Sequence, residues 1–213
     1  MALSQRLFDA IVEGKADLAK SLVEEELKVG TDPTALISGT MIPAMDEVGK
    51  LFEQEEYFVP ELLLAGRAMK AAMEPLRPLL TASGAKPVGV VVAGTVKGDL
   101  HDIGKNLVVS MLEGAGFQVV DAGVDVSPQQ FVAAIREHNA GIVCLSALLT
   151  VTMTAMKSTV EAIKDAGLRK SVKILVGGAP LNEKYAHEIG ADGYGASATE
   201  AVALARRQVG LAN

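Results

Sequence analysis

Residues 88–106 read VGVVVAGTVKGDLHDIGKN, and this stretch decides the fold of the second part of the chain. Its first six residues, Val88–Ala93, are apolar or small, which is typical of a strand buried on both faces of a parallel sheet. The following loop, Gly94–Asn106, is glycine-rich and contains an aspartate and a histidine two residues apart. In open α/β sheets, ligands bind beyond the carboxyl ends of the strands, so this loop is a candidate ligand site.

The chain after residue 88 alternates between short apolar runs and segments with helical periodicity. Further strands are expected at Gln118–Asp121, Gly141–Leu145 and Val172–Val176, with a short last strand near Gly193 and Tyr194. Helices are expected between them, at about 103–115, 128–138, 152–166, 181–189 and from residue 199. Such alternation requires right-handed crossovers and predicts a doubly wound, flavodoxin-like α/β domain with a five-stranded parallel sheet.

The first 80 residues have helical spacing throughout. Apolar residues form four stripes, beginning with the one that contains Leu3 and Leu7. Asp32 followed by Pro33 is typical of a helix start and predicts where the third helix begins; Pro60 predicts the start of the fourth. Four helices of about 12–20 residues joined by short turns favour an N-terminal four-helix bundle, because that packing buries all four stripes.

The segment Thr81–Pro87 is small and polar, which indicates a linker. We therefore expect a helical-bundle domain at 1–81, a linker at 82–87 and a Rossmann-like domain at 88–213. Charge divides the same way, since acidic residues outnumber basic ones by six in residues 1–85 and the two balance in the remainder.

The composition excludes several classes of protein. A net charge of −6 argues against a nucleic-acid partner held by neutralisation of its phosphates. The single cysteine, Cys144, excludes an internal disulfide framework, and its apolar strand predicts an inert core thiol. No apolar run approaches the roughly 20 residues of a membrane span, and the first residues lack a signal-peptide pattern. A cytoplasmic protein with no membrane partner is expected.

The loop after the first strand holds the most informative pair of residues. Asp99 lies two residues before His101, so its carboxylate could orient the imidazole through one ring nitrogen and make the other more basic. This arrangement suits a metal ligand or a general base, and Gly104 would permit a close backbone approach. A helix N-cap by Asp99 or Asp102 beside a surface histidine would give the same pattern.

Two later loops carry small or hydroxyl-bearing residues. After the third strand, Ser146, Thr150 and Thr152 either line a ligand pocket or cap the next helix. After the fourth strand, Gly177 and Gly178 either leave room for a flat or bulky group or form a tight turn.

The order of these loops is more specific than any loop alone. Asp-x-His-x-x-Gly at 99–104, Ser-x-Leu at 146–148 and Gly-Gly at 177–178 together form a cobalamin-binding signature. The chain closely resembles the corrinoid proteins of anaerobic methyltransferase systems, and is similar to the cobalamin module of cobalamin-dependent methionine synthase. The resemblance covers nearly the full length, because residues 48–62 look like the cap helices that lie over the corrin in those proteins.

The resemblance implies a role for each residue of the signature. His101 would be the lower axial cobalt ligand in place of the cofactor's own dimethylbenzimidazole, whose nucleotide tail would thread into the sheet. Asp99 would hydrogen-bond the ring nitrogen of His101 that faces away from cobalt. Thr152 would complete the relay where methionine synthase has a serine, and its extra methyl group restricts the rotamer.

The implied cofactor is cobalamin, as methylcobalamin or a related corrinoid. Ser146 and Thr150 would contact its buried tail, Gly177 and Gly178 would make space for it, and Gly104 would let the chain pass close to it. The complete implied set of cofactor-binding residues is Phe58, Gly98, Asp99, His101, Asp102, Ile103, Gly104, Ser146, Leu148, Thr150, Gly177, Gly178 and Ala198. Phe58, with Leu62, would shield the methyl group on the upper face of the corrin; the alternative for Phe58 is plain bundle core.

The function implied is that of a methyl carrier without a substrate site of its own, that is, a non-catalytic subunit. One partner, a donor-specific methyltransferase, would load the methyl group from a methoxyaromatic, a methylamine or a betaine. A second methyltransferase would pass it to tetrahydrofolate or coenzyme M, and a reductive activase is a further expected partner.

Three other functions are compatible with parts of this pattern. An adenosylcobalamin mutase subunit would share Asp99, His101 and Gly104, but the helical cap and the lack of a barrel favour the carrier. A cobalamin-based sensor usually needs a DNA-binding domain, whereas this bundle is acidic. A receiver needs a phosphorylatable aspartate where the third strand ends in Ser146, and a flavodoxin needs a hydroxyl-rich loop that Val96–Gly98 does not provide well.

Overall fold

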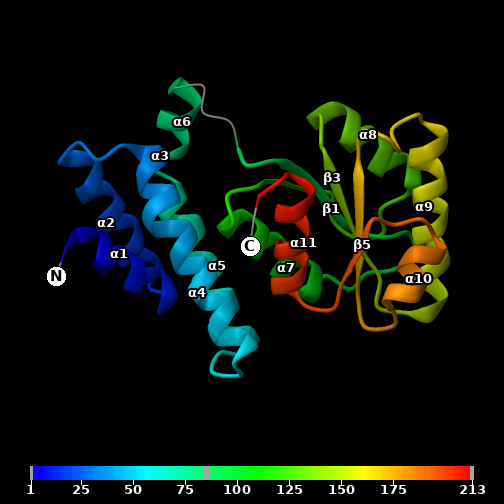
Figure 1. The fold of residues 1–213 in the computed structure, drawn as a ribbon, viewed down its shortest axis with the longest axis horizontal. Coiled ribbons are helices and arrows are strands. Elements are labelled where there is room, and N and C mark those ends of the chain that lie inside the picture. The colour runs from blue at the N-terminus through cyan, green and yellow to red at the C-terminus, as the bar shows by residue number, and fades with distance from the viewer. Residues whose placement is uncertain (1, 84–86, 212–213) are drawn as a thin grey trace. The chain divides into compact units, whose positions relative to one another are not determined.

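The structure is a computed structural model, which describes residues 2–83 and 87–211. The chain divides into two compact units (Figure 1). The helical unit comprises Met1–Pro87 and Glu113–Gly116, and the α/β unit comprises Val88–Leu112 and Phe117–Asn213. None of the helices in the described part of the chain is long and apolar enough to cross a membrane.

The described residues of the helical unit form four long helical stretches and one short helix. Its elements are α1 (Leu3–Val12), α2 (Ala16–Lys28), α3 (Pro33–Leu36), η1 (Ile37–Met41), α4 (Ile42–Glu53), α5 (Val59–Met73) and α6 (Arg77–Ser83). Leu7, Ile11 and Leu22 are fully buried, as the apolar stripes require. Asp32 caps the third stretch, because its carboxylate accepts a hydrogen bond from the backbone N–H of Ala35 at 2.8 Å.

Two details of this unit differ from the expectation. The third stretch is continuous from residue 33 to 53 but contains a π-helical turn, Ile37–Met41. Pro43 explains it: proline has no N–H for the carbonyl group of Gly39, and its ring displaces that carbonyl. Helix α6 also extends two residues into the expected linker, through Ala82, the strongest helix former, to Ser83 at its end; residues 84–86 of that linker lie outside the described part.

The α/β unit is a five-stranded parallel sheet in the order β2-β1-β3-β4-β5, which confirms the doubly wound, flavodoxin-like fold. The strands are β1 (Val90–Thr95), β2 (Gln118–Asp121), β3 (Ile142–Ser146), β4 (Lys173–Gly177) and β5 (Gly193–Gly195). The helices are α7 (Ile103–Gly114), α8 (Pro128–His138), α9 (Met153–Asp165), α10 (Glu183–Glu188) and α11 (Ala198–Gln208), with a 3-10 turn η2 (Thr150–Thr152). Helices α7 and α11 lie on one face of the sheet and α8, α9 and α10 on the other (Figure 1).

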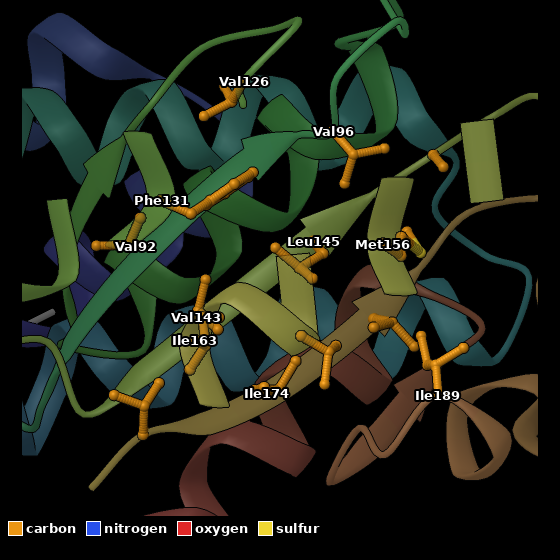
Figure 2. Packing of buried hydrophobic residues seen from close by; sticks show 14 of the residues in the cluster. Val92, Val96, Val126, Phe131, Val143, Leu145, Met156, Ile163, Ile174 and Ile189 are labelled. Carbon is orange, nitrogen blue, oxygen red and sulfur yellow. The ribbon is translucent and has the colours of Figure 1, made fainter. Parts of the chain in front are cut away.

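The core of the α/β unit lies between the sheet and helices α8–α10. Val92, Val143 and Ile174 from the strands pack with Phe131 and Met156 from the helices, and all five are buried (Figure 2). Cys144 lies in β3 and is also buried, and this burial raises the pKa of its thiol to about 12. The expected core position of this cysteine is therefore confirmed, and its lack of reactivity stays a prediction.

Candidate functional site

The register of the sheet aligns the predicted loops at one edge. Thr95 of β1 pairs with Ser146 of β3, Ser146 with Gly177 of β4, and Gly177 with Gly195 of β5. These residues end their strands and form a row across the sheet. The loops that follow, with the Asp-x-His, Ser-x-Leu and Gly-Gly sequences, therefore begin side by side at the carboxyl edge.

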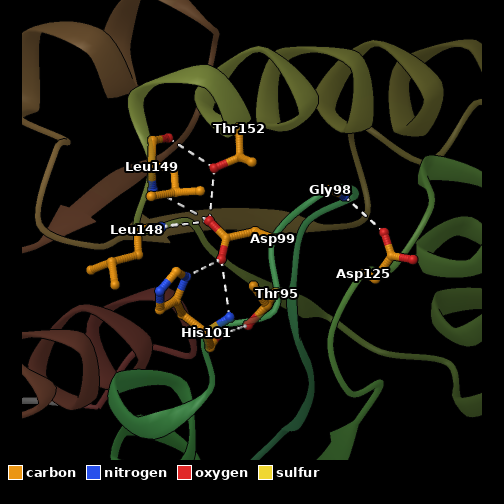
Figure 3. Close-up of polar contacts among 8 residues, drawn as sticks. All are labelled: Thr95, Gly98, Asp99, His101, Asp125, Leu148, Leu149 and Thr152. Atoms are coloured by element: carbon orange, nitrogen blue, oxygen red, sulfur yellow. Dashed lines mark hydrogen bonds and ion pairs between the residues drawn. The ribbon is translucent and has the colours of Figure 1, made fainter.

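The carboxylate of Asp99 joins two of these loops (Figure 3). Its Oδ1 atom accepts hydrogen bonds from the backbone N–H of His101 at 3.0 Å and lies 2.8 Å from Nδ1 of the His101 ring. Its Oδ2 atom accepts from the backbone N–H of Leu148 at 2.8 Å and from the hydroxyl of Thr152 at 2.7 Å. Asp99 is fully buried, whereas half of the His101 side chain, 51%, is exposed.

This environment fixes the charge of Asp99. Burial on its own raises the pKa of a carboxyl group, but the N–H donors of Leu148 and His101 and the Thr152 hydroxyl all stabilise the anion. Together they hold the pKa of Asp99 well below its usual range. Asp99 is therefore ionised at neutral pH and can only accept hydrogen bonds.

An ionised Asp99 determines the tautomer of His101. The Nδ1 atom must carry the hydrogen that faces the carboxylate, so in the neutral ring the lone pair lies on Nε2. Within the described residues, Nε2 of His101 has no hydrogen-bond partner. The ring thus presents one basic nitrogen outward, as a histidine ligand held by a carboxylate does.

Thr152 preserves the relay in spite of its added methyl group. Its hydroxyl contacts Oδ2 of Asp99 and also lies 2.8 Å from the carbonyl oxygen of Leu149. The expected hydrogen-bonded series of His101, Asp99 and Thr152 is therefore present, and the methyl group of Thr152 does not prevent it.

The surface beside His101 is apolar. Leu100 and Ile103 flank His101 in the first loop and are each 72% exposed. Leu148, Leu149 and Val151 of the second loop are 42%, 42% and 75% exposed. Single exposed apolar side chains are ordinary, but these five lie within two residues of His101 or next to residues that bond the Asp99 carboxylate, where a large, mainly apolar ligand would cover them.

Two glycines of the site, Gly178 and Gly104, differ in what surrounds them. Gly178 has a φ of 130°, and a Cβ atom there would lie 1.9 Å from the carbonyl oxygen of Ala147. The protein's own backbone thus requires this glycine. At Gly104 no protein atom lies within 4 Å of the position that a Cβ atom would take. Apart from its own helix and chain neighbours, nothing fills the space there, so the protein's packing does not require this glycine.

The structure places the other expected residues as follows. Ser146 is partly buried, Thr150 is exposed, and Ala198 is the buried first residue of α11. Gly98 has a φ of 85°, which favours glycine. Asp102 is exposed and accepts a hydrogen bond from the side chain of Asn106 at 3.1 Å.

Phe58 and Leu62 belong to the helical unit. Phe58 precedes α5 and is 62% exposed, so the alternative that it is plain bundle core is wrong. Leu62 is fully buried on the packed face of α5, and its expected part in shielding the methyl group stays a prediction.

Three polar residues of this edge were not predicted. The hydroxyl of Thr95 donates to the carbonyl oxygen of His101 at 2.7 Å. The ammonium group of Lys105, which is almost fully buried, pairs with Asp121 at the end of β2. No local pattern reveals such a pair, because its members are sixteen residues apart on different elements.

The residues fit a metal-containing ring cofactor held by one protein ligand. They offer one outward imidazole nitrogen, an apolar surface around it and an open position at a glycine, while no cluster of three His, Cys, Asp or Glu residues capable of holding a metal occurs within the described residues. A flavodoxin-like unit that carries such a site at the carboxyl edge of its sheet, accompanied by a helical unit, defines a class of ligand-binding proteins.

Comparison with known proteins identifies the family. A family model described as a B12 binding domain matches residues 89–203, and a second, also described as a B12 binding domain, matches residues 3–77. The chain therefore belongs to the B12-binding proteins, and the predicted resemblance is confirmed.

Three relatives are informative. The dimethylamine corrinoid protein of Methanosarcina barkeri is 44% identical over 96% of each chain. A cobalamin-binding protein from Desulfitobacterium hafniense is 34% identical over 99% of this chain and 100% of that one, with a TM-score of 0.80. A chain of the methanol:cobalamin methyltransferase complex from Methanosarcina barkeri is 29% identical over 99% of this chain and 81% of that one, with a TM-score of 0.86.

Proposed function

We propose that this protein is a corrinoid methyl carrier that binds cobalamin through His101 and shuttles a methyl group between two methyltransferases. The observation that carries the proposal is the outward Nε2 atom of His101, whose ring the buried, ionised Asp99 orients. The match to a dimethylamine corrinoid protein along nearly the whole of both chains supports it.

In this proposal the protein holds the cofactor and the cofactor supplies the chemistry. Cobalamin provides a cobalt ion that accepts and gives up a methyl group. His101 would be the protein ligand of that cobalt through Nε2, in place of dimethylbenzimidazole. The tail would pass Gly104 and meet Ser146, Thr150 and Ala198 at the carboxyl edge.

Asp99 and Thr152 would act through His101. The Asp99 carboxylate would hold Nδ1 of His101 and so keep the ring in the one orientation in which Nε2 can bind a metal. The ionised carboxylate accepts from Nδ1, so Nε2 is the ring nitrogen left to serve as the ligand. Thr152 keeps the second oxygen of that carboxylate paired throughout.

The helical unit would cover the reactive face of the corrin. Its exposed aromatic residue, Phe58, is the proposed shield of the methyl group. Such a cover must move before a partner's substrate can reach the cofactor. We accordingly propose 1–81 as the cap domain and 88–213 as the cofactor domain, with residues 82–87 connecting them.

The proposed partners are a donor-specific methyltransferase, a second methyltransferase serving tetrahydrofolate or coenzyme M, and a reductive activase. Among the candidate donors a methylamine is favoured, since the relative that is 44% identical is named for dimethylamine. The proposal includes a cytoplasmic location, which the unpaired Cys144 fits.

The test is His101→Gly, loaded with cobalamin alongside the wild type. We expect the variant to keep the corrinoid but to show an altered visible spectrum and slower methyl transfer, because only the lower ligand is lost. His187→Gly is the matched control, since His187 is exposed on α10. An unchanged spectrum for His101→Gly would refute the ligand assignment, and failure of the wild type to take up corrinoid would refute the proposed function.

A further inference from the structure

The loop between β2 and α8 contacts the Asp99 loop from the side opposite to Leu148 and Thr152 (Figure 3). Its key residue is Asp125. The Oδ1 atom of Asp125 accepts a hydrogen bond from the backbone N–H of Gly98 at 2.8 Å. In the reverse direction, the backbone N–H of Asp125 donates to the carbonyl oxygen of Asp99 at 2.9 Å. The two loops therefore hold each other on both sides of the Gly98–Asp99 peptide.

We call these two hydrogen bonds, which join Asp125 to Gly98 and Asp99, the clamp. The backbone on both sides of the clamp has an unusual conformation. Asp125 has a φ of 55°, which is left-handed and uncommon for a residue other than glycine, and Gly98 has a φ of 85°. Aspartate tolerates this region better than most residues, but the conformation still needs support from its surroundings. The paired hydrogen bonds between the loops provide that support.

Adjacent contacts continue the clamp into the sheet. Val96 and Val126 form an isolated parallel bridge beyond the ends of β1 and β2. The backbone N–H of Thr95 donates to Gly123, and that of Val126 donates to Thr95, each at 3.0 Å. The loop that carries Asp99 is thus attached to its neighbour from residue 95 to residue 99.

The ion pair between Lys97 and Asp125 holds the two loops together less strongly than the backbone hydrogen bonds do. Nζ of Lys97 lies 2.9 Å from Oδ2 of Asp125, but both side chains are about half exposed. Exposed pairs of this kind are screened by water and contribute little. The N–H of Gly98 holds the pKa of Asp125 below its usual range, followed in effect by Lys97, which agrees with the backbone contact being the main one.

We propose that Asp125 is a positioning residue that sets where Asp99, and through it the His101 ring, lies in the cofactor site. It has no contact with His101. It acts on the backbone of the Asp99 loop, whereas Leu148 and Thr152 act on the Asp99 side chain. The consequence for cobalt ligation rests on the proposed function, but the effect on Asp99 does not.

Two substitutions at Asp125 separate the side-chain acceptor from the backbone conformation. Asp125→Gly keeps the left-handed conformation but removes the oxygen that accepts from Gly98. Asp125→Asn keeps both an acceptor oxygen and tolerance of positive φ, and loses only the charge. Asn139→Gly is the matched control, because Asn139 is another left-handed residue of the same unit, with a φ of 50°, at the end of α8.

The first measurement uses the protein without cofactor. The backbone N–H groups of His101 and Leu148 both donate to the Asp99 carboxylate, so their hydrogen exchange reports its position. Asp125→Gly should exchange about tenfold faster at both sites, as the loss of one hydrogen bond implies. Asp125→Asn and Asn139→Gly should stay within about threefold of the wild type, less than that loss. Wild-type exchange in Asp125→Gly, equal acceleration in Asn139→Gly, or no rescue by asparagine would each overturn the proposal.

The second measurement uses the cobalamin-loaded protein. We expect Asp125→Gly to retain corrinoid but to show part of the spectral change seen in His101→Gly, while Asp125→Asn resembles the wild type. A wild-type spectrum in Asp125→Gly would overturn the link from Asp125 to the His101 ring. If the wild type took up no corrinoid, the proposed function would fail, and the exchange data would still decide the role of Asp125.

Discussion

Asp99→Asn is the substitution that tests the site most directly, because an amide cannot replace both oxygens of this carboxylate. Oδ1 accepts from the backbone N–H of His101, and Oδ2 from the backbone N–H of Leu148. An asparagine has one acceptor oxygen and one donor NH2 group. Whichever way it is turned, its NH2 group faces one of these two backbone N–H groups, and that donor loses its partner in a buried site.

The expected cost follows from these contacts. A buried donor without a partner costs about 2 kcal/mol, and replacing a charged acceptor by a neutral one weakens the remaining hydrogen bonds by about 1 kcal/mol. The α/β unit of Asp99→Asn should therefore be less stable by about 3 kcal/mol at neutral pH. Thr152 moderates the loss in one orientation, since its hydroxyl can donate to the carbonyl oxygen of Leu149 instead.

The pKa of Asp99 also determines how its contribution to the stability of the fold changes with pH. The pKa of Asp99 in the folded protein lies below its unfolded value, so its stabilisation is complete above about pH 4 and is lost as the pH falls through the folded pKa. The difference in stability between the wild type and Asp99→Asn should thus narrow below about pH 4.

The assay is native-state hydrogen exchange at core amides of β1 and β3, such as those of Val92 and Val143, which are fully buried. These amides report the unfolding of the α/β unit separately from the helical unit. Asp165→Asn, at an exposed position at the end of α9, is the control and should change stability by less than about 0.5 kcal/mol. A loss below about 1 kcal/mol in Asp99→Asn, or a difference that does not narrow in acid, would contradict the reasoning.

Three further outcomes are expected in the protein without cofactor. Thr152→Val should destabilise the α/β unit by about 2 kcal/mol through loss of the hydroxyl donor to Asp99, and Thr152→Ser by much less, as measured by the same exchange. Gly178→Ala should lower the free energy of unfolding by more than about 3 kcal/mol or prevent folding, because the new methyl group would meet a backbone carbonyl. The control Gly167→Ala, at a φ of 76° in open space, should lower it by about 1 kcal/mol, with both measured by urea unfolding. Cys144 should not react with iodoacetamide in the native protein at mildly alkaline pH and should react rapidly once unfolded, since burial raises its pKa to about 12; rapid labelling of the folded protein would contradict its burial.

Local sequence patterns predicted helices and strands well where the spacing of apolar residues matches the residues that are buried. The residues expected for β2 and α8, 118–121 and 128–138, are those observed. The third helix shows where such reasoning is incomplete. Its apolar stripe predicts one regular helix, but Pro43 changes the backbone hydrogen bonding one turn earlier, and periodicity does not register this.

The ends of the strands show a second reason why local patterns predict the elements incompletely. β1, β3 and β4 each run past their apolar residues, to Thr95, Ser146 and Gly177. A central parallel strand continues for as long as its neighbours supply backbone hydrogen bonds, and polar or glycine residues can make these as well as valine can. The composition of one strand cannot show how far its neighbours extend.

The order of the strands explains why the site is built around Asp99. β1 lies between β2 and β3, so the loop that leaves β1 has a neighbouring loop on each side. The loop after β3 provides Leu148 and Thr152 for the Asp99 side chain, and the loop after β2 provides Asp125 for the Asp99 backbone. A flavodoxin-like order, once predicted, already implies two such neighbours at the switch point of the sheet. It does not say which residue on the β2 side makes the contact, because that depends on the left-handed turn at Asp125.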